Sequence, residues 1–150
     1  KTINIMIFSK ACEYGIKAAV YIAEQSINGN RASLKGISKE IGSPEAFTAK
    51  ILQTLVKHNV ISSIKGSSGG FEADLKKINK TKLIEIVLAI DGSLHEGKCV
   101  LGLNQCSEVK PCPVHNKYKH IKKDISVMLE KTTLAEMSNS VIEGLSCLKN

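Results

Sequence analysis

A pair of short helices joined by a tight glycine turn constrains the fold of this chain more than any other feature of its sequence. Ser33 is a good N-cap for the first helix, because its hydroxyl can accept a hydrogen bond from a free backbone N–H of the first turn. Leu34, Ile37 and Ile41 give that helix one apolar side, and Gly42 ends it. Two short helices with a glycine turn between them predict a helix-turn-helix.

The second helix of the pair is expected to start immediately after the turn. Ser43 is expected to be its N-cap and Pro44 its first residue, where the missing N–H of proline costs nothing. The helix is expected to end near Asn59, because asparagine tolerates the left-handed conformation of a C-cap. Its expected buried side chains are spaced by four, one and three residues: Phe47, Ile51, Leu52 and Leu55.

The residues that follow predict a β-hairpin. Residues 60–65 have the composition of a strand, residues 66–70 form a turn of glycine and serine, and residues 71–73 return as a second strand. Two helices followed by a hairpin is the order of the winged helix-turn-helix. We therefore expect a mainly α-helical fold with a small β-hairpin wing, and a DNA-binding domain at residues 6–80, starting from Met6.

Two further helices complete the expected core. Ser9 and Thr81 can each cap an amphipathic helix, the first of which ends before the turn at residues 28–30. The two isolated cysteines, Cys12 and Cys147, fall in apolar helical patterns, and we expect both to be buried as small hydrophobic side chains. The apolar positions are Cys12, Ile16, Ala19, Val20 and Ala23 in the first helix and Leu83, Ile86, Val87 and Ile90 in the second.

Residues 81–150 are expected to form a second unit that senses and dimerises. A loop without helical or strand periodicity covers residues 93–113, and we interpret it as a sensor loop. Residues 115–131 predict a long amphipathic helix, and residues 134–148 predict a last one. A single small module buries too little surface for tight DNA binding, so we expect a homodimer built on the long helix. Packing of the same apolar stripe on its own subunit is the alternative; the stripe is Tyr118, Ile121, Ile125, Met128 and Leu129.

The composition favours a polyanionic partner and argues against several classes of function. The net charge is +7, which favours binding of double-stranded DNA. The apolar runs are far shorter than the ~18 residues that a membrane span needs, and no secretory leader opens the chain, so we expect a cytoplasmic protein that does not bind membranes. We find no nucleophile–base pattern and no phosphate-cradling loop, and therefore expect neither an enzyme nor a small-molecule substrate.

The solvated face of the third helix is the predicted DNA-reading surface, because a helix of this kind enters the major groove. Thr48 and Gln53 carry groups that can read base edges, whereas Lys50 and Lys57 are expected to contact phosphates. The wing tip adds backbone N–H groups that glycine leaves accessible. The alternative is an ordinary solvated surface. The full set of expected DNA-binding residues is Thr48, Lys50, Gln53, Thr54, Lys57, Lys65, Ser67 and Ser68.

A cluster of cysteines in the 93–113 loop predicts a metal site. Cys99, Cys106 and Cys112 lie within fourteen residues, and His115 follows the last of them by three positions. Thiolates with an imidazole suit zinc or an iron–sulfur cluster. Zinc knuckles hold their cysteines in pairs two to four residues apart, and these wider intervals favour a loop draped over a cluster instead. Three free thiols that can oxidise are the alternative.

The sequence resembles a bacterial family of winged-helix repressors, the Rrf2 family, which includes the iron–sulfur regulator IscR, the nitric-oxide sensor NsrR and the cysteine-metabolism repressor CymR. The resemblance covers residues 6–148 and is most specific over the wing, residues 55–71, while residues 12–15 are similar to the family's first helix. Two departures are Asn59, where the family usually has glycine, and Ala73, where it usually has leucine. Neither threatens the fold, since asparagine adopts the same backbone conformation.

The resemblance implies a homodimer whose long helix crosses between subunits and whose cluster loop lies near the partner's DNA-binding domain. It implies that Cys99, Cys106 and Cys112 hold iron, with His115 as fourth ligand as in IscR. In NsrR-like relatives a carboxylate from the first helix of the other subunit can replace the histidine, and Glu13 matches that position. The first cysteine interval is one residue longer than in IscR, which leaves both [2Fe–2S] and [4Fe–4S] open.

These features together predict a sequence-specific transcription regulator, a repressor, that senses iron–sulfur, redox or nitric-oxide status through a cluster. The alternative is a cluster-free regulator of the same fold that senses through thiols, zinc or a partner protein. An iron–sulfur carrier without a DNA role is a third hypothesis, against which the wing glycines and Lys50 and Lys57 argue.

Overall fold

Helix α1 (Lys10–Ile27) is the element around which the chain folds. The computed structural model describes residues 7–93 and 99–150, so Met6 and residues 94–98 of the expected sensor loop lie outside the described residues. The hydroxyl of Ser9 caps α1 as expected, by accepting a hydrogen bond from the backbone N–H of Cys12. Cys12 and Ile22 are fully buried, and burial together with the nearby Asp91 carboxylate raises the pKa of Cys12 to about 12.

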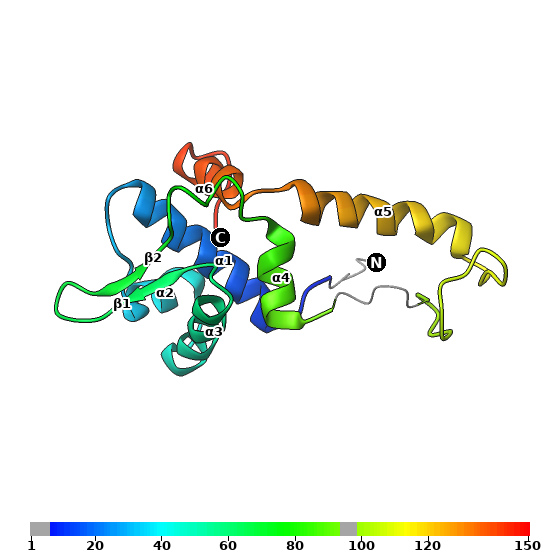
Figure 1. Cartoon of the computed structure of the whole chain (residues 1–150), viewed down its shortest axis with the longest axis horizontal. Coiled ribbons are helices and arrows are strands. Elements are labelled where there is room, and N and C mark those ends of the chain that lie inside the picture. Colours follow the sequence, from blue (N-terminus) through cyan, green and yellow to red (C-terminus); the bar gives the residue numbers. More distant parts are fainter. Residues whose placement is uncertain (1–6, 94–98) are drawn as a thin grey trace.

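Helices α2 (Leu34–Ile41) and α3 (Glu45–Lys57) form the predicted helix-turn-helix against α1 (Figure 1). Gly42 joins them in the left-handed conformation, at φ 67°. The expected cap of α3 is wrong: Pro44 is the N-cap, and Ser43 is buried and makes no capping bond. Asn59 takes the left-handed conformation that its C-terminal position requires, at φ 59°.

The wing is a two-stranded antiparallel hairpin, β1 (Ser62–Ile64) and β2 (Gly70–Glu72). Strand β1 is shorter than the predicted residues 60–65, and β2 has the predicted length but begins one residue earlier. Ala32, in the segment between α1 and α2, lies against the other edge of β2 and exchanges two backbone hydrogen bonds with Phe71, of 3.0 and 2.8 Å. The wing is therefore held at its base by the connection between α1 and α2.

The hydrophobic core lies among α1, α2, α3 and two further helices that pack on α1, α4 (Leu83–Asp91) and α6 (Leu134–Ile142), and α4 also contacts α3. Leu52 and Leu55 of α3 are fully buried in it, as predicted. Phe47 was expected there and is instead 38% exposed, with its ring edge-on to Tyr14 at 5.9 Å between centroids. The side chain one position further, Thr48, takes the buried place.

Two other local predictions are corrected. Thr81 does not cap α4; its hydroxyl donates to the carbonyl of Lys77, and α4 begins after Lys82, whose N–H donates to Glu85. Helix α6 ends at Ile142 rather than near residue 148, and Cys147 beyond it is exposed.

Helix α5 (His115–Lys131) has the predicted bounds and extends away from the rest of the molecule as an arm (Figure 1). Its C-terminal end is tied to the body, since the N–H of Leu83 donates to Thr132 and the N–H of Leu134 donates to Thr81. The cysteine loop lies at its other end. Across the described ranges, no helix is both long and apolar enough to serve as a membrane span.

Shortening one buried side chain of α3 tests the core. Leu52→Ala removes a fully buried side chain, and we expect it to lower the free energy of unfolding by about 2–5 kcal/mol, because a cavity replaces it. Gln53→Ala, at the exposed neighbouring position, is the matched control and should change it by less than about 0.5 kcal/mol. Chemical denaturation followed by circular dichroism measures both, and equal effects would contradict the described packing.

Candidate functional site

The outer face of α3 carries most of the predicted DNA-reading side chains. Lys50, Gln53 and Lys57 are exposed there, and Thr54 is half-buried with its hydroxyl donating to the Lys50 carbonyl at 3.1 Å. The placement of Thr48 on this face is wrong. Its side chain is fully buried, and its hydroxyl donates to the Pro44 carbonyl at 2.9 Å.

The sequence contained a signal for the position of Thr48. Residue 48 precedes the buried Ile51, Leu52 and Leu55 by three, four and seven positions, which is the spacing of one helical face. A threonine at such a position can be buried because its hydroxyl bonds to the carbonyl four residues earlier, within its own helix.

The wing tip places Lys65, Ser67 and Ser68 in solvent, as predicted. Its backbone requires glycine at two points. Gly66 has φ 104°, and a Cβ on Gly69 would lie 2.2 Å from the carbonyl oxygen of Ile64. The tip is therefore a tight turn with side chains that can reach a neighbouring polyanion.

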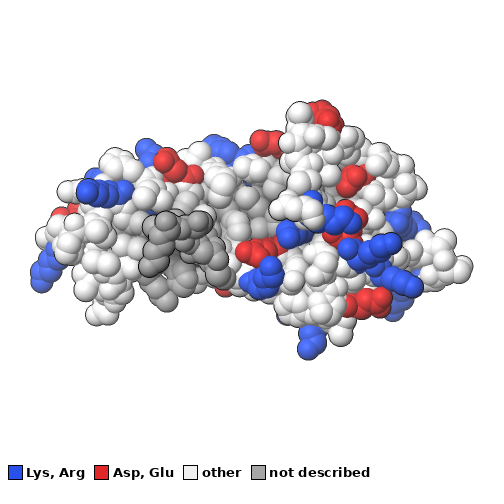
Figure 2. All heavy atoms as spheres, turned by 180° about the vertical axis from the view of Figure 1, so that it is seen from behind, with Lys and Arg blue, Asp and Glu red and all other residues white. Residues whose placement is uncertain are grey.

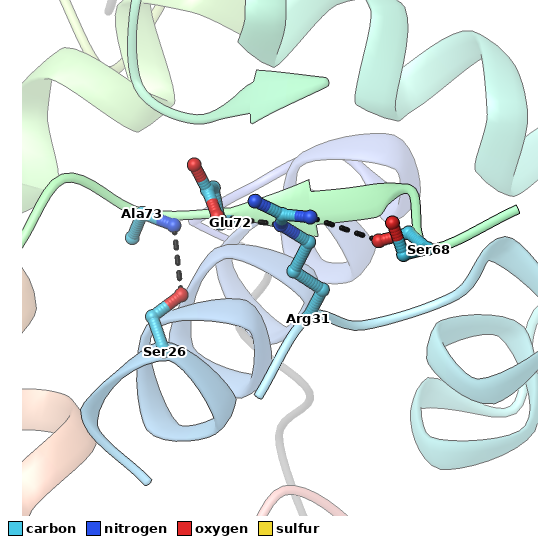
Figure 3. Close-up of polar contacts among 5 residues, drawn as sticks. All are labelled: Ser26, Arg31, Ser68, Glu72 and Ala73. Carbon is cyan, nitrogen blue, oxygen red and sulfur yellow. Dashed lines mark hydrogen bonds and ion pairs between the residues drawn. The ribbon is translucent and has the colours of Figure 1, made fainter. Parts of the chain in front are cut away.

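Arg31 is a residue of this surface that the sequence reasoning missed. Its guanidinium lies between the two ends of the wing turn: Nε donates to Glu72 at 2.8 Å and Nη1 donates to the Ser68 carbonyl at 2.8 Å (Figure 3). A signal existed, because Arg31 is the only arginine among the 21 basic residues of the chain. Figure 2 shows Lys and Arg side chains gathered around the end of the molecule that carries the wing, with acidic side chains between them.

The cysteine loop brings three thiols and an imidazole together at the start of α5. Cys99, Cys112 and His115 are 7, 8 and 6% exposed, and Cys106 is half-buried. The sulfur of Cys106 lies 3.4 Å from Nδ1 of His115. His115 is positioned as the first residue of α5, with its N–H donating to the Cys112 carbonyl at 3.0 Å.

The thiols of this cluster differ in acidity. The pKa of Cys99 is lowered, chiefly because the backbone N–H of Leu101 donates to its sulfur. Burial raises the pKa of Cys112, and the neighbouring thiolates of Cys99 and Cys106 add to the effect because like charges repel. Cys99 is therefore the thiol of this pair that loses its proton more readily, and Cys112 the one that keeps it.

One buried atom supports a ligand at this place. Nε2 of His115 is buried and has no hydrogen-bond partner within the described structure, although buried polar atoms are normally satisfied. Among the described residues, no three His, Cys, Asp or Glu side chains are close enough together to enclose a single metal ion. Cysteine and histidine are ligands that an iron–sulfur cluster takes, so the chemistry of this donor set fits such a cluster.

Glu13, the alternative fourth ligand, is not part of this gathering. It lies in the first turn of α1 and pairs with Lys10 at 3.2 Å. Figure 1 places the cysteine loop at the far end of α5, away from α1 of the same chain. A contribution from Glu13 would have to come from a second subunit.

The fold and this surface define a class of protein: a winged helix-turn-helix DNA-binding regulator with a cysteine-bearing arm. Residues 8–140 match the model of the Rrf2 family, described as "Iron-dependent Transcriptional regulator". An HTH-type transcriptional regulator of Aquifex aeolicus is 31% identical over 137 residues, which cover 89% of this chain and 92% of that protein. The chain belongs to the Rrf2 family of transcription regulators, which are not enzymes.

Solved structures share the fold. The structure of CymR, "the Global Cysteine Regulator of B. subtilis", matches with a TM-score of 0.73 at 18% identity and covers 90% of this chain and 98% of that one. T. potens IscR matches with a TM-score of 0.68 at 20% identity and covers 97% of this chain and 93% of that one. The winged-helix prediction is therefore confirmed.

Neutralising one lysine of α3 tests the DNA-reading face. We expect Lys50→Gln to weaken binding to duplex DNA about threefold or more and to reduce the slope of log K against log[salt] by about one, because one phosphate contact is lost. Lys123→Gln, an exposed lysine of α5, is the charge-matched control. Fluorescence anisotropy over a salt series measures both, and equal slopes for the two variants would remove Lys50 from the interface.

Proposed function

We propose that this protein is a homodimeric repressor whose affinity for operator DNA is set by an iron–sulfur cluster on Cys99, Cys106, Cys112 and His115. The observation that carries the proposal is the buried His115, whose Nδ1 lies 3.4 Å from the sulfur of Cys106 and whose Nε2 has no partner in the described structure, in a loop that also buries the thiols of Cys99 and Cys112. Membership of a family described as iron-dependent supports it. When bound, such a cluster supplies a redox- and nitric-oxide-sensitive group that can be lost or altered.

The choice of His115 as fourth ligand rests on its position. It lies beside Cys106, and its unpartnered nitrogen is available for a metal, whereas Glu13 lies in another element and is already paired with Lys10. The chain's own part in the chemistry is to keep the ligands together and dry. Cys99 contributes a sulfur whose pKa is already lowered, which favours the thiolate form that metals require.

The proposed DNA interface combines α3 and the wing. Gln53 and Thr54 would read base edges, while Lys50, Lys57 and Lys65 would contact phosphates, with Ser67 and Ser68 at the wing tip. We keep residues 6–80 as the DNA-binding part and residues 81–150 as the sensing and dimerising part. This division is functional, because α4 and α6 of the second part pack directly on α1 of the first.

The dimer is proposed to form along α5. This arm exposes apolar side chains in the single chain: Ile121, Val127 and Met128 are 54, 48 and 40% exposed. A row of such side chains on an arm that leaves the body favours burial against a second copy. The cysteine loop at the end of the arm would then lie near the partner's DNA-binding part.

The ligand assignment is tested by removing one thiol. Cys106→Ala, purified without oxygen, is expected to lose the visible absorbance of the cluster and most of its iron and sulfide, because the cluster loses a ligand. Cys147→Ala, at the exposed cysteine outside the loop, is the matched control and should keep both. An unchanged spectrum in Cys106→Ala would remove this cysteine from the site, and a colourless wild-type protein would favour the thiol, zinc or partner-sensing regulator.

The dimer is tested by a charge on the arm. Ile121→Asp places a carboxylate in the proposed interface, and we expect it to shift the protein from dimer to monomer, because an unpaired charge is costly to bury. Sedimentation velocity measures the mass of each species. Lys123→Asp, exposed on the same helix, is the control for added negative charge. A dimeric Ile121→Asp protein, or a monomeric wild type, would contradict the proposed interface.

A further inference from the structure

The wing is too short to hold its own turn in place. Three residues of each strand are paired, and an isolated two-stranded hairpin is marginally stable in water. Two supports act at its base: Ala32 pairs with Phe71, and the Ser26 hydroxyl oxygen accepts a hydrogen bond from the N–H of Ala73 at 2.9 Å (Figure 3). Both hold β2 and leave the turn at residues 65–69 to other contacts.

One side chain reaches that turn from outside the hairpin. Among the hydrogen bonds of the described residues, the bond from Nη1 of Arg31 to the carbonyl of Ser68 is the one that does so. The same guanidinium is fixed by its Nε to the carboxylate of Glu72 on β2. In Figure 3 the Arg31 side chain stands between these two partners, so the strand and the turn are joined through one planar group.

The chemistry of this contact requires arginine. Two different N–H groups of one guanidinium donate in fixed directions to two acceptors, which the single ammonium of lysine reproduces poorly. Of the 21 lysine and arginine residues of the chain, Arg31 is the one arginine and the other twenty are lysines. This usage separates Arg31 from the lysines that cover the surface.

We propose that Arg31 is a positioning residue that holds the tip of the wing in the geometry required for DNA binding, with Glu72 fixing its direction. The proposal rests on the proposed DNA interface, in which Lys65, Ser67 and Ser68 of the wing tip contact DNA. Arg31 acts through the carbonyl of Ser68 rather than by touching DNA itself.

Direct contact of Arg31 with a phosphate is the competing explanation, and it predicts opposite results. A phosphate-binding Arg31 would be replaced well by lysine, and neutralising Glu72 would free its charge and strengthen DNA binding. A positioning Arg31 is replaced poorly by lysine, and Glu72→Gln weakens DNA binding because the guanidinium loses its anchor.

The first measurement needs no DNA. We expect Arg31→Gln and Arg31→Lys to accelerate amide hydrogen exchange of Gly69 by about tenfold. The N–H of Gly69 donates to the carbonyl of Gly66 within the turn, and this bond should open more often when Arg31 no longer holds the turn. The thermal midpoint should change by no more than about 2 °C, since the Arg31–Glu72 pair is exposed on both sides. Unchanged exchange of Gly69 in both variants overturns the proposal.

The second measurement uses a duplex that the wild-type protein has selected from a randomised library. We expect Arg31→Lys and Glu72→Gln to bind it about threefold to tenfold more weakly, with an unchanged salt slope, because no phosphate contact is removed. Tighter binding by Glu72→Gln, or wild-type binding by Arg31→Lys, overturns the positioning role in favour of direct contact.

Lys65→Gln separates failure of this proposal from failure of the proposed interface. If Lys65→Gln weakens binding and the Arg31 variants do not, the wing contacts DNA without needing Arg31, and the positioning role is overturned. If Lys65→Gln and the Arg31 variants all bind as wild type, the wing does not contact DNA. That result would contradict both the proposed interface at the wing and the proposed role of Arg31.

Discussion

The burial of α1 is the constraint on which the rest of the molecule depends. This one helix contacts α2, α3, α4, α6 and β2, and its small side chains, among them Ala18, Ala19 and Ala23, are fully buried. Small residues let several elements approach one axis closely, so α3, α4 and α6 all pack directly on α1, and α3 also contacts α4. A shift of α1 would therefore move the proposed DNA-reading face relative to the arm.

The start of α1 is also where the cysteine loop leaves the body. Asp91, the last residue of α4, accepts hydrogen bonds from the backbone N–H of Ser9 at 3.1 Å and from its hydroxyl, and the loop follows directly after Gly92. The loop thus begins beside the N-cap of α1 and ends at the first residue of α5, His115. This arrangement would connect the proposed cluster to the proposed DNA-binding part in two ways, through α4 and α1 and through the proposed dimer contact along α5.

The sequence predicted what local chemistry determines and missed what tertiary packing determines. The helix-turn-helix, Gly42, Asn59 and the bounds of α5 follow from caps, turn residues and periodicity, which act over a few positions. Thr48 and Phe47 were exchanged because hydrophobicity favours phenylalanine at a buried position, although the spacing to Ile51, Leu52 and Leu55 fits position 48 better. The contacts of Arg31 could not be predicted from spacing, because its partners Ser68 and Glu72 lie far along the chain. The unpartnered Nε2 of His115 could not be predicted either, because it depends on how the loop folds.

The central claim is that the state of the cysteine cluster sets the affinity for DNA. The most direct measurement is titration of one self-selected duplex with protein purified without oxygen, before and after removal of the cluster by a chelator, with iron, sulfide and visible absorbance recorded on the same samples. We expect a coloured protein whose affinity for DNA changes by about tenfold or more when iron and sulfide are lost, which is a typical coupling of about 1–3 kcal/mol. Equal affinity of the two forms, or a protein that takes up no iron or sulfide even after reconstitution, would contradict it.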